Sequence, residues 1–226
     1  MCALCACGRI GFDATDRFDV DGPTTDTGPA DLVLHVGFDS DGLLRDRARG
    51  HTLTCGSCPL QVGGQVGEAA MFDGTNCILV ADAVDLRPAV FTFSAWGASV
   101  ANEDATIVGR PLNGATTGDN TFQMFVGGNL WRLGFNGGGR LMTTATAGAW
   151  HHVAGTFDGA TLTMYVDGTA ITGTTVGAAQ YANDDLMIGC DRDVGAVIGL
   201  WRGLIDEVRL YARPLSAAEV AVLAQP

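Results

Sequence analysis

The sequence predicts an all-β protein, built as a two-sheet antiparallel sandwich with one short C-terminal helix. The clearest observation is the stretch from Trp150 to Ile171, in which two runs of alternating apolar and polar residues flank Asp158-Gly159. Side chains alternate along a strand and Asp-Gly suits a tight turn, so this stretch predicts a β-hairpin. The composition agrees, because 32 glycines and only four glutamates suit short strands joined by turns.

The remaining elements follow from apolar or alternating runs bounded by Gly, Asn and Asp. Strands are expected at 32–38, 69–72, 77–80, 90–100, 106–109, 121–126, 130–136, 169–174, 185–189 and 203–211, with loops at 39–50 and 111–120. The one good helix is predicted at 216–224, because Ser216 and Glu219 have the spacing of a capping box. No internal repeat is evident, so residues 32–226 are expected to form one domain.

The first 31 residues are expected to lie outside that domain. Residues 1–12 include Leu4-Cys5-Ala6-Cys7-Gly8, which resembles a truncated bacterial lipoprotein signal and makes Cys7 a candidate for lipidation. Only six residues precede Cys7, so the alternative is a Cys-rich terminus that matches by chance. Residues 13–31 are rich in Asp, Thr and Pro, which predicts an acidic, flexible linker.

The charge of the chain restricts its partners. The formal net charge is −12, and phosphates of nucleic acid or anionic lipid would be repelled. No apolar run approaches the roughly 20 residues of a membrane-spanning helix. The sequence therefore predicts neither nucleic-acid binding nor a transmembrane span, while a lipid anchor would hold the domain at a membrane.

Two segments resemble the LamG-like jelly-roll domains of the concanavalin A-like lectin/glucanase superfamily. The first is WHHVAGTFDG at 150–159, followed by a strand that ends in YVDG at 165–168. The second is GLIDEVRLY at 203–211, followed by RPLS at 213–216 and by Glu219. The resemblance covers residues 32–224 and implies a concanavalin A-like jelly roll.

The function that the resemblance implies is a non-catalytic, extracytoplasmic module that binds glycans or a surface protein. A purely structural or adhesive domain of a surface lipoprotein is the alternative, and a glycoside hydrolase is a third. Hydrolases of this superfamily carry paired carboxylates in an E-x-D-x-x-E run, and none of the four glutamates lies in one. Asp206 and Glu207 are adjacent on a predicted strand and should point to opposite faces. An enzyme is therefore not expected.

Four cysteines lie in the predicted domain: Cys55, Cys58, Cys77 and Cys190. A redox CxxC motif begins a helix, which Pro59 opposes, and a zinc ribbon needs a second Cys pair. Disulfides suit an exported protein, and three pairings are open. We prefer Cys55–Cys58 with Cys77–Cys190, because the latter two lie in predicted strands.

Calcium is the cofactor that the resemblance implies, as a structural ion held where an early Asp-containing loop meets the last strand. The matching positions are Asp46 and Asp206, with Asp73 as a third candidate. The loop around Asp46 departs from the usual D-x-S-G-x-G at Ala48 and Arg49. The alternative for Asp206 is a buried carboxylate that accepts hydrogen bonds from backbone N–H groups.

Sugar binding uses aromatic platforms together with a few polar groups. The candidate platforms are Trp131, Tyr181 and Trp201, and the candidate polar residues in nearby loops are Asp184, Asp191, Asp193 and Arg202. Trp96 and Trp150 are expected in the core. His151 and His152 are adjacent on a strand and cannot bind one metal ion together, so one is expected to pack and the other to pair with a polar neighbour.

Overall fold

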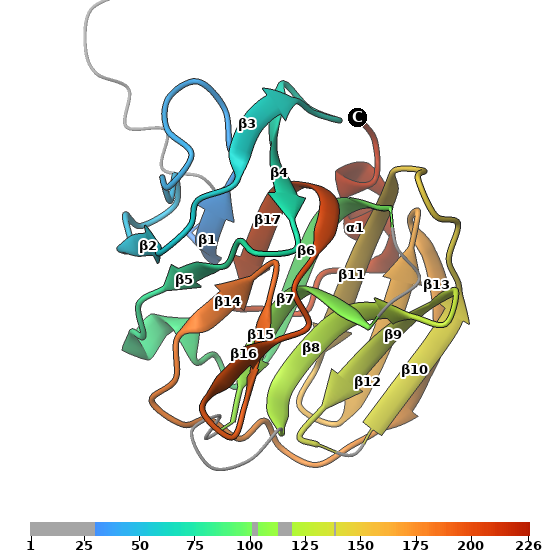
Figure 1. Cartoon of the computed structure of the whole chain (residues 1–226). Helices are drawn as coiled ribbons and strands as arrows, with labels where there is room; N and C mark the ends of the chain where they lie inside the picture. The colour runs from blue at the N-terminus through green and yellow to red at the C-terminus, as the bar shows by residue number, and fades with distance from the viewer. Residues whose placement is uncertain (1–29, 101–103, 113–118, 138) are drawn as a thin grey trace, which may run out of the picture.

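The protein is an antiparallel β-sandwich, as the sequence predicts (Figure 1). The computed structural model describes residues 30–100, 104–112, 119–137 and 139–226. The lipoprotein-like segment 1–12 with Cys7 and almost all of the expected linker 13–31 lie outside the described residues. No helix among the described residues is long and apolar enough to cross a membrane.

Two sheets form the sandwich. Sheet 1 has the strand order β13-β12-β11-β6-β17-β4-β3, with β1 paired to β17. Its strands are β1 (Leu32–Val36), β3 (Leu60–Gly63), β4 (Glu68–Asp73), β6 (Phe91–Ser99), β11 (His151–Phe157), β12 (Thr161–Val166), β13 (Thr169–Thr175) and β17 (Arg202–Tyr211).

Sheet 2 has the order β10-β9-β8-β7-β14-β5-β2. Its strands are β2 (Leu53–Cys55), β5 (Ile78–Val80), β7 (Ala105–Pro111), β8 (Asn120–Gly127), β9 (Leu130–Phe135), β10 (Gly139–Thr144) and β14 (Leu186–Ile188). A separate hairpin consists of β15 (Asp191–Asp193) and β16 (Ala196–Ile198), and a short 3-10 helix spans Val84–Leu86.

The predicted central hairpin is confirmed as β11 and β12. At its turn, Oδ1 of Asp158 accepts hydrogen bonds from the backbone N–H groups of Ala160 (2.9 Å) and Thr161 (2.7 Å). The next turn places Asp167 at φ 50° and Gly168 at φ 73°, a conformation that Asp and Gly tolerate best. The local sequence thus determines both reversals.

The core lies between the two sheets. Phe91 and Phe93 of β6 face inward, and Phe93 stacks on Phe122 of sheet 2 with ring centroids 4.6 Å apart. Phe157 and Phe135 form a second contact across the sandwich at 4.8 Å. Fully burying each such side chain contributes about 1.5–3 kcal/mol.

The C-terminal helix α1 (Ala217–Leu223) packs on the outer side of sheet 1 (Figure 1). The predicted capping box is present: the N–H of Glu219 donates to Oγ of Ser216, and the N–H of Ser216 donates to Oε2 of Glu219 at 2.7 Å. Val220 is buried in a small apolar cluster with Tyr165 and Tyr211. Periodicity and capping therefore predict this helix correctly.

Five strands were not expected from the sequence: β2, β3, β10, β15 and β16. They are three to six residues long, and β15 reads Asp-Arg-Asp. Such short segments carry little alternation of their own, because their pairing depends on the neighbour that they meet.

Candidate functional site

The structure joins the cysteines as Cys55–Cys58 and Cys77–Cys190, the pairing preferred from the sequence. The second disulfide links positions 113 residues apart, next to the paired strands β5 and β14. The Nδ2 group of Asn76 donates to the carbonyl oxygen of Cys58 (3.2 Å) and holds the CxxC loop beside Cys77. Both disulfides therefore fix loops at one end of sheet 2.

The β15–β16 hairpin lies on the outer face of sheet 2, over β7 and β14 (Figure 1). The N–H of Thr106 donates to the carbonyl oxygen of Gly199, at 2.8 Å. Asp191, which is buried, accepts hydrogen bonds at Oδ2 from Nδ2 of Asn120 (2.9 Å) and Nε2 of Gln123 (2.8 Å). The hairpin thereby divides the outer face into two halves.

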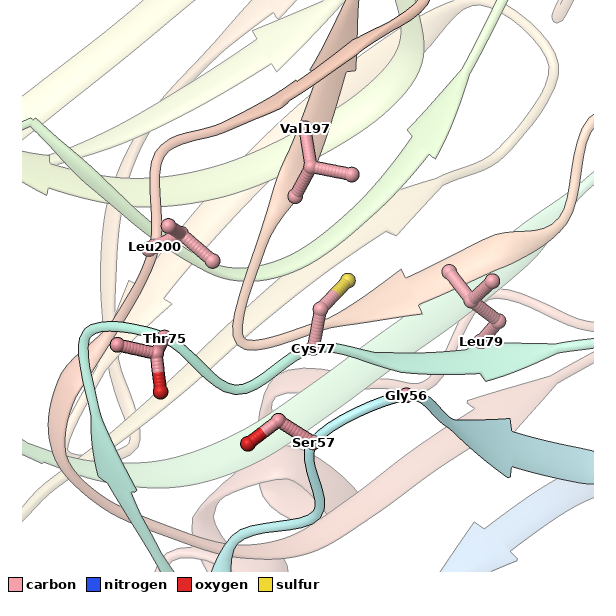
Figure 2. Close-up of a pocket in the computed structure, with 7 residues that line it drawn as sticks. All are labelled: Gly56, Ser57, Thr75, Cys77, Leu79, Val197 and Leu200. Atoms are coloured by element: carbon pink, nitrogen blue, oxygen red, sulfur yellow. The ribbon is translucent and has the colours of Figure 1, made fainter.

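One half holds an apolar pocket of about 310 Å³ (Figure 2). It is lined by Gly56, Ser57, Thr75, Cys77, Leu79, Val197 and Leu200. Aliphatic side chains and the sulfur of Cys77 face the space, with two hydroxyl groups at its edge (Figure 2). Such walls suit an apolar group rather than a hydroxylated sugar ring.

The other half holds a polar surface that we call the outer-face site, made of Gln123 and Phe125 on β8 with Arg132 and Gly134 on β9. Gln123 pairs with Gly134 and Phe125 with Arg132, so the four residues form a two-by-two block. The residues between them, Met124 and Leu133 among others, belong to the core. Because side chains alternate along a strand, the block faces outward.

Neighbouring groups hold the polar side chains of this site in place. The guanidinium carbon of Arg132 lies 5.8 Å from the ring centroid of Phe125, within cation–π range. Nε2 of Gln123 donates to Oγ1 of Thr106 and to Oδ2 of Asp191, both at 2.8 Å. Since Nε2 carries both bonds, Oε1 is the atom of this amide that can accept from a ligand. Donors and an acceptor therefore flank Gly134, which has no side chain.

The prediction of aromatic platforms is wrong for Trp131 and Trp201. Their exposed fractions are 1% and 0%, and the two rings stack on each other with centroids 6.0 Å apart. Both indoles fill the core, so neither offers a ring face to a sugar. Tyr181 is half-buried, its hydroxyl donates to the carbonyl oxygen of Pro88 (2.7 Å), and burial raises the pKa of that hydroxyl. Trp96 is buried as expected, whereas Trp150 is only partly buried.

Three of the four predicted polar ligand residues meet near the hairpin. Asp191 and Asp193 lie on β15, and Asp184 forms an ion pair with Arg192 between them, at 3.8 Å. Burial raises the pKa of Asp191. Arg202 lies elsewhere, exposed on β17 beside Gly74 of the β4–β5 turn. The structure therefore does not bring Arg202 to the other three residues.

The outer-face site was missed from the sequence. The signal was present, because Trp131, Leu133 and Phe135 alternate with Arg132 and Gly134 along β9. That alternation assigns Arg132 to the outer face. It does not reveal that Phe125 and Gln123 on β8 lie opposite, since their register depends on the β8–β9 turn.

The histidine pair has the structural roles that were expected. Nδ1 of His151 lies 2.8 Å from Oδ2 of Asp167. His152 is fully buried and packs edge-on against Trp96, with ring centroids 5.4 Å apart. Burial lowers the pKa of His152 to about 4, so its ring is neutral near pH 7.

Asp46 does not fit the calcium role that the resemblance implies. Its buried carboxylate accepts hydrogen bonds from the backbone N–H groups of His35, Ala48, Arg49 and His51, and from Nδ1 of His51 at 2.7 Å. N–H donors approach both oxygens, and their positive ends would repel a cation. Asp46 therefore holds its loop through hydrogen bonds.

Asp206 differs because one of its oxygens is unpartnered. Oδ2 accepts from the N–H groups of Gln65 (3.1 Å) and Val66 (2.9 Å), while Oδ1 is buried without a hydrogen-bond partner. Burial raises the pKa of this carboxyl group to about 7. Glu207, at a bulge with φ 53°, turns to His35 and Arg209 instead.

The described residues contain no group of three or more His, Cys, Asp and Glu side chains that could hold a metal ion. Asp73 is exposed, and its Oδ1 accepts from the N–H and hydroxyl groups of Thr75. Asp46 and Asp206 bind different loops and share no hydrogen-bond partner within the described ranges. A structural Ca²⁺ at Asp206 therefore stays a prediction.

Chelation tests that prediction. We expect EDTA to lower the melting temperature by several degrees, because an ion that binds only the folded state stabilises it by about 2.7 kcal/mol at a hundredfold excess over Kd. Asp206→Asn should abolish the response to EDTA in calorimetry. Asp46→Asn should keep it, since N–H donors already occupy that carboxylate. An unchanged melting curve in EDTA would leave Asp206 as a buried, hydrogen-bonded carboxylate.

Known structures with a similar sandwich include binding domains and parts of enzymes. Domain 4 of AbnA, an extracellular GH43 arabinanase from Geobacillus stearothermophilus solved with arabinotriose, has a TM-score of 0.70 and 20% identity, over 86% of this chain and 98% of that chain. The binding domain of Paraclostridial Mosquitocidal Protein 1 has a TM-score of 0.68 and 16% identity, over 86% of this chain and 52% of that chain.

A Trypanosoma rangeli sialidase gives a TM-score of 0.68 at 19% identity, over 88% of this chain and 33% of that chain. At these identities the likeness shows the fold alone. No curated protein matches the sequence. The sequence pattern of Laminin_G_3, described as concanavalin A-like lectin/glucanases superfamily, matches residues 72–221, which is more than half of the chain. The chain therefore belongs to the concanavalin A-like lectin/glucanase superfamily.

Proposed function

We propose that this domain is a non-catalytic, extracytoplasmic binding module whose ligand is a glycan. The observation that carries the proposal is the outer-face site, where Arg132 and Gln123 are held in place on either side of Gly134. Hydroxyl groups need fixed donors and acceptors, and a ring needs space between them. The arabinotriose complex of AbnA domain 4 supports the same ligand class for this fold.

The non-catalytic role rests on how the carboxylates are used. Asp206 accepts from a backbone turn through Oδ2, and Glu207 binds His35 and Arg209, so both acidic groups of β17 have structural contacts. Asp191, the carboxylate nearest the outer-face site, is buried and bound to two amides. Glycoside hydrolysis requires two carboxyl groups that flank one bond. Turnover of any glycan by the purified domain would contradict this part of the proposal.

The extracytoplasmic location rests on the two disulfides, because such bonds persist in oxidising compartments. We propose a position at the cell surface or in the periplasm, with Cys7 as the residue that carries a lipid anchor. Mass spectrometry of the protein from its native membrane fraction tests the anchor directly.

Recognition of a surface protein is the second candidate, and the apolar pocket favours it. The pocket is open at the molecular surface, and Val197, which lines it, is 46% exposed. An aliphatic side chain of a partner would fill such a space. A structural or adhesive domain without a soluble ligand is the remaining alternative.

An array of glycans and matrix proteins, probed with and without Ca²⁺, separates these functions. We expect the wild-type domain and Arg202→Gln to bind a glycan, and Arg132→Gln to bind it at least about tenfold more weakly, because a hydrogen bond to a charged group contributes about 1.5–3 kcal/mol. Binding to proteins alone, abolished by Val197→Asp and kept by Arg132→Gln, would assign the function to the pocket. Silence across the array would leave the structural role.

A further inference from the structure

Most arginines whose side chains the structure describes are paired with carboxylates. The chain has no lysine, so its 13 positive side chains are all arginines. Of the ten whose side chains the structure describes, eight form ion pairs with Asp or Glu: Arg45, Arg47, Arg49, Arg87, Arg110, Arg192, Arg209 and Arg213. Among the described residues, Arg132 and Arg202 form no ion pair; Arg202 is exposed to solvent, whereas Arg132 is partly buried. In a chain of net charge −12, a partly buried cation without an ion pair requires an explanation.

The position of Arg132 provides that explanation. Its side chain stacks over Phe125 on the outer face of sheet 2. Its Nη2 atom lies 3.6 Å from the position that a Cβ atom on Gly128 would take. Its Nε atom is buried without a hydrogen-bond partner. Stacking on a ring face leaves the N–H groups in the guanidinium plane able to bind an anion. On the neighbouring strand β10, the residue opposite Arg132 is Met142, which is 50% exposed and carries no acidic group.

Building on the proposed glycan function, we propose that the outer-face site selects acidic sugars and that Arg132 binds the sugar carboxylate. A guanidinium matches a carboxylate with two parallel N–H···O bonds, and such charge-assisted bonds are roughly twice as strong as neutral ones. Gln123 accepts from a ring hydroxyl, and the space above Gly134 receives the ring. A uronic acid residue of a polysaccharide carries both the carboxylate for Arg132 and the ring hydroxyl for Gln123.

The net negative charge of the protein sets the salt dependence of this binding. At about 0.15 M ionic strength the Debye length is about 8 Å, so charges elsewhere on the protein are screened while the contact at Arg132 remains. Lower salt would strengthen the repulsion between the ligand and the rest of the chain. Binding of a short acidic oligosaccharide is therefore expected to weaken as salt is lowered.

Gly134 offers a test that leaves Arg132 itself unchanged. A Cβ atom built on Gly134 would meet only the carbonyl oxygen of Gln123, at 3.9 Å, and Gly134 does not have positive φ. Gly134→Asp would place a carboxylate beside Arg132 and neutralise it, and Gly134→Asn is the uncharged control of equal size. Any side chain at this position also takes some of the space for the sugar ring. The effect of charge is therefore measured as the difference in binding between Gly134→Asp and Gly134→Asn.

The experiment is calorimetric titration with trigalacturonic acid, its methyl ester, galactotriose and a sulfated galactotriose, on protein whose folding is verified by circular dichroism. We expect the acid to bind at least about tenfold more tightly than the ester. Arg132→Gln and Gly134→Asp should remove that preference, while Gly134→Asn and Arg202→Gln keep it and Arg132→Lys keeps part of it.

Equal binding of acid and ester by the wild-type protein would overturn the inference and leave the glycan function standing. Tighter binding of the sulfated sugar would overturn the assignment to a carboxylate. A preference for the acid that survives in both Arg132→Gln and Gly134→Asp would overturn the role of Arg132. Failure to bind any of the four sugars, together with silence on the glycan array, would overturn the proposed function as well.

Discussion

Replacing Cys77 and Cys190 by serine is expected to lower the free energy of unfolding by up to about 4–5 kcal/mol. The disulfide joins two positions 113 residues apart, and half of the strands of sheet 1 and all but one of sheet 2 lie between them. In the chain-entropy model the effect comes from the unfolded state, whose freedom increases once the loop opens. The value is an upper figure, because β5 and β14 remain hydrogen-bonded to each other in the reduced form.

Urea denaturation of the double variant measures this effect. The matched control is Cys55→Ser with Cys58→Ser, which opens a loop of sequence separation 3 and should cost much less. Mass spectrometry of the non-reduced wild-type domain should find no free thiol among the four cysteines. An equal loss of stability in the two double variants would contradict the loop-closure explanation.

Acidification from pH 6.5 to pH 4 is expected to destabilise the protein through His152 by about 3 kcal/mol, since each pKa unit corresponds to about 1.4 kcal/mol. Burial lowers the pKa of His152 from 6.5 to about 4 in the folded state. The unfolded chain therefore binds a proton at a higher pH than the folded one. The contribution is fully present above pH 6.5 and is lost as the pH falls toward 4. His35, whose pKa burial also lowers to about 4, acts in the same direction.

Asp206 acts with the opposite sign, because burial raises its pKa to about 7. The folded state holds that proton more tightly, so this contribution increases as the pH falls from 7 toward 4. The effect of His152 is therefore measured as a difference between variants. His152→Leu should flatten the decline of the unfolding free energy between pH 6.5 and 4, and Asp206→Asn should steepen it. An unchanged slope in His152→Leu would show that its ring is solvated.

The sequence by itself determined the elements with strong local signals. The Asp158-Gly159 turn, the inward face of β6 and the capping box of Ser216 and Glu219 depend only on residues close together in the chain. Periodicity, turn chemistry and capping are local properties, so they survive without knowledge of the partner strand. The two segments that resemble LamG-like domains extended the prediction from these elements to the whole sandwich. The preferred disulfide pairing followed from two predicted strands.

Only the tertiary structure decided which side chains are buried and which polar groups are already occupied. Trp131 and Trp201 are of the residue type that forms sugar-binding platforms, yet both are buried and fill the core. Asp46 has the position of a calcium ligand, yet backbone N–H groups occupy its oxygens. Arg132 meets Phe125 only through the register of β8 and β9. Burial and pairing are long-range properties, because they depend on which segments distant in sequence come to lie together.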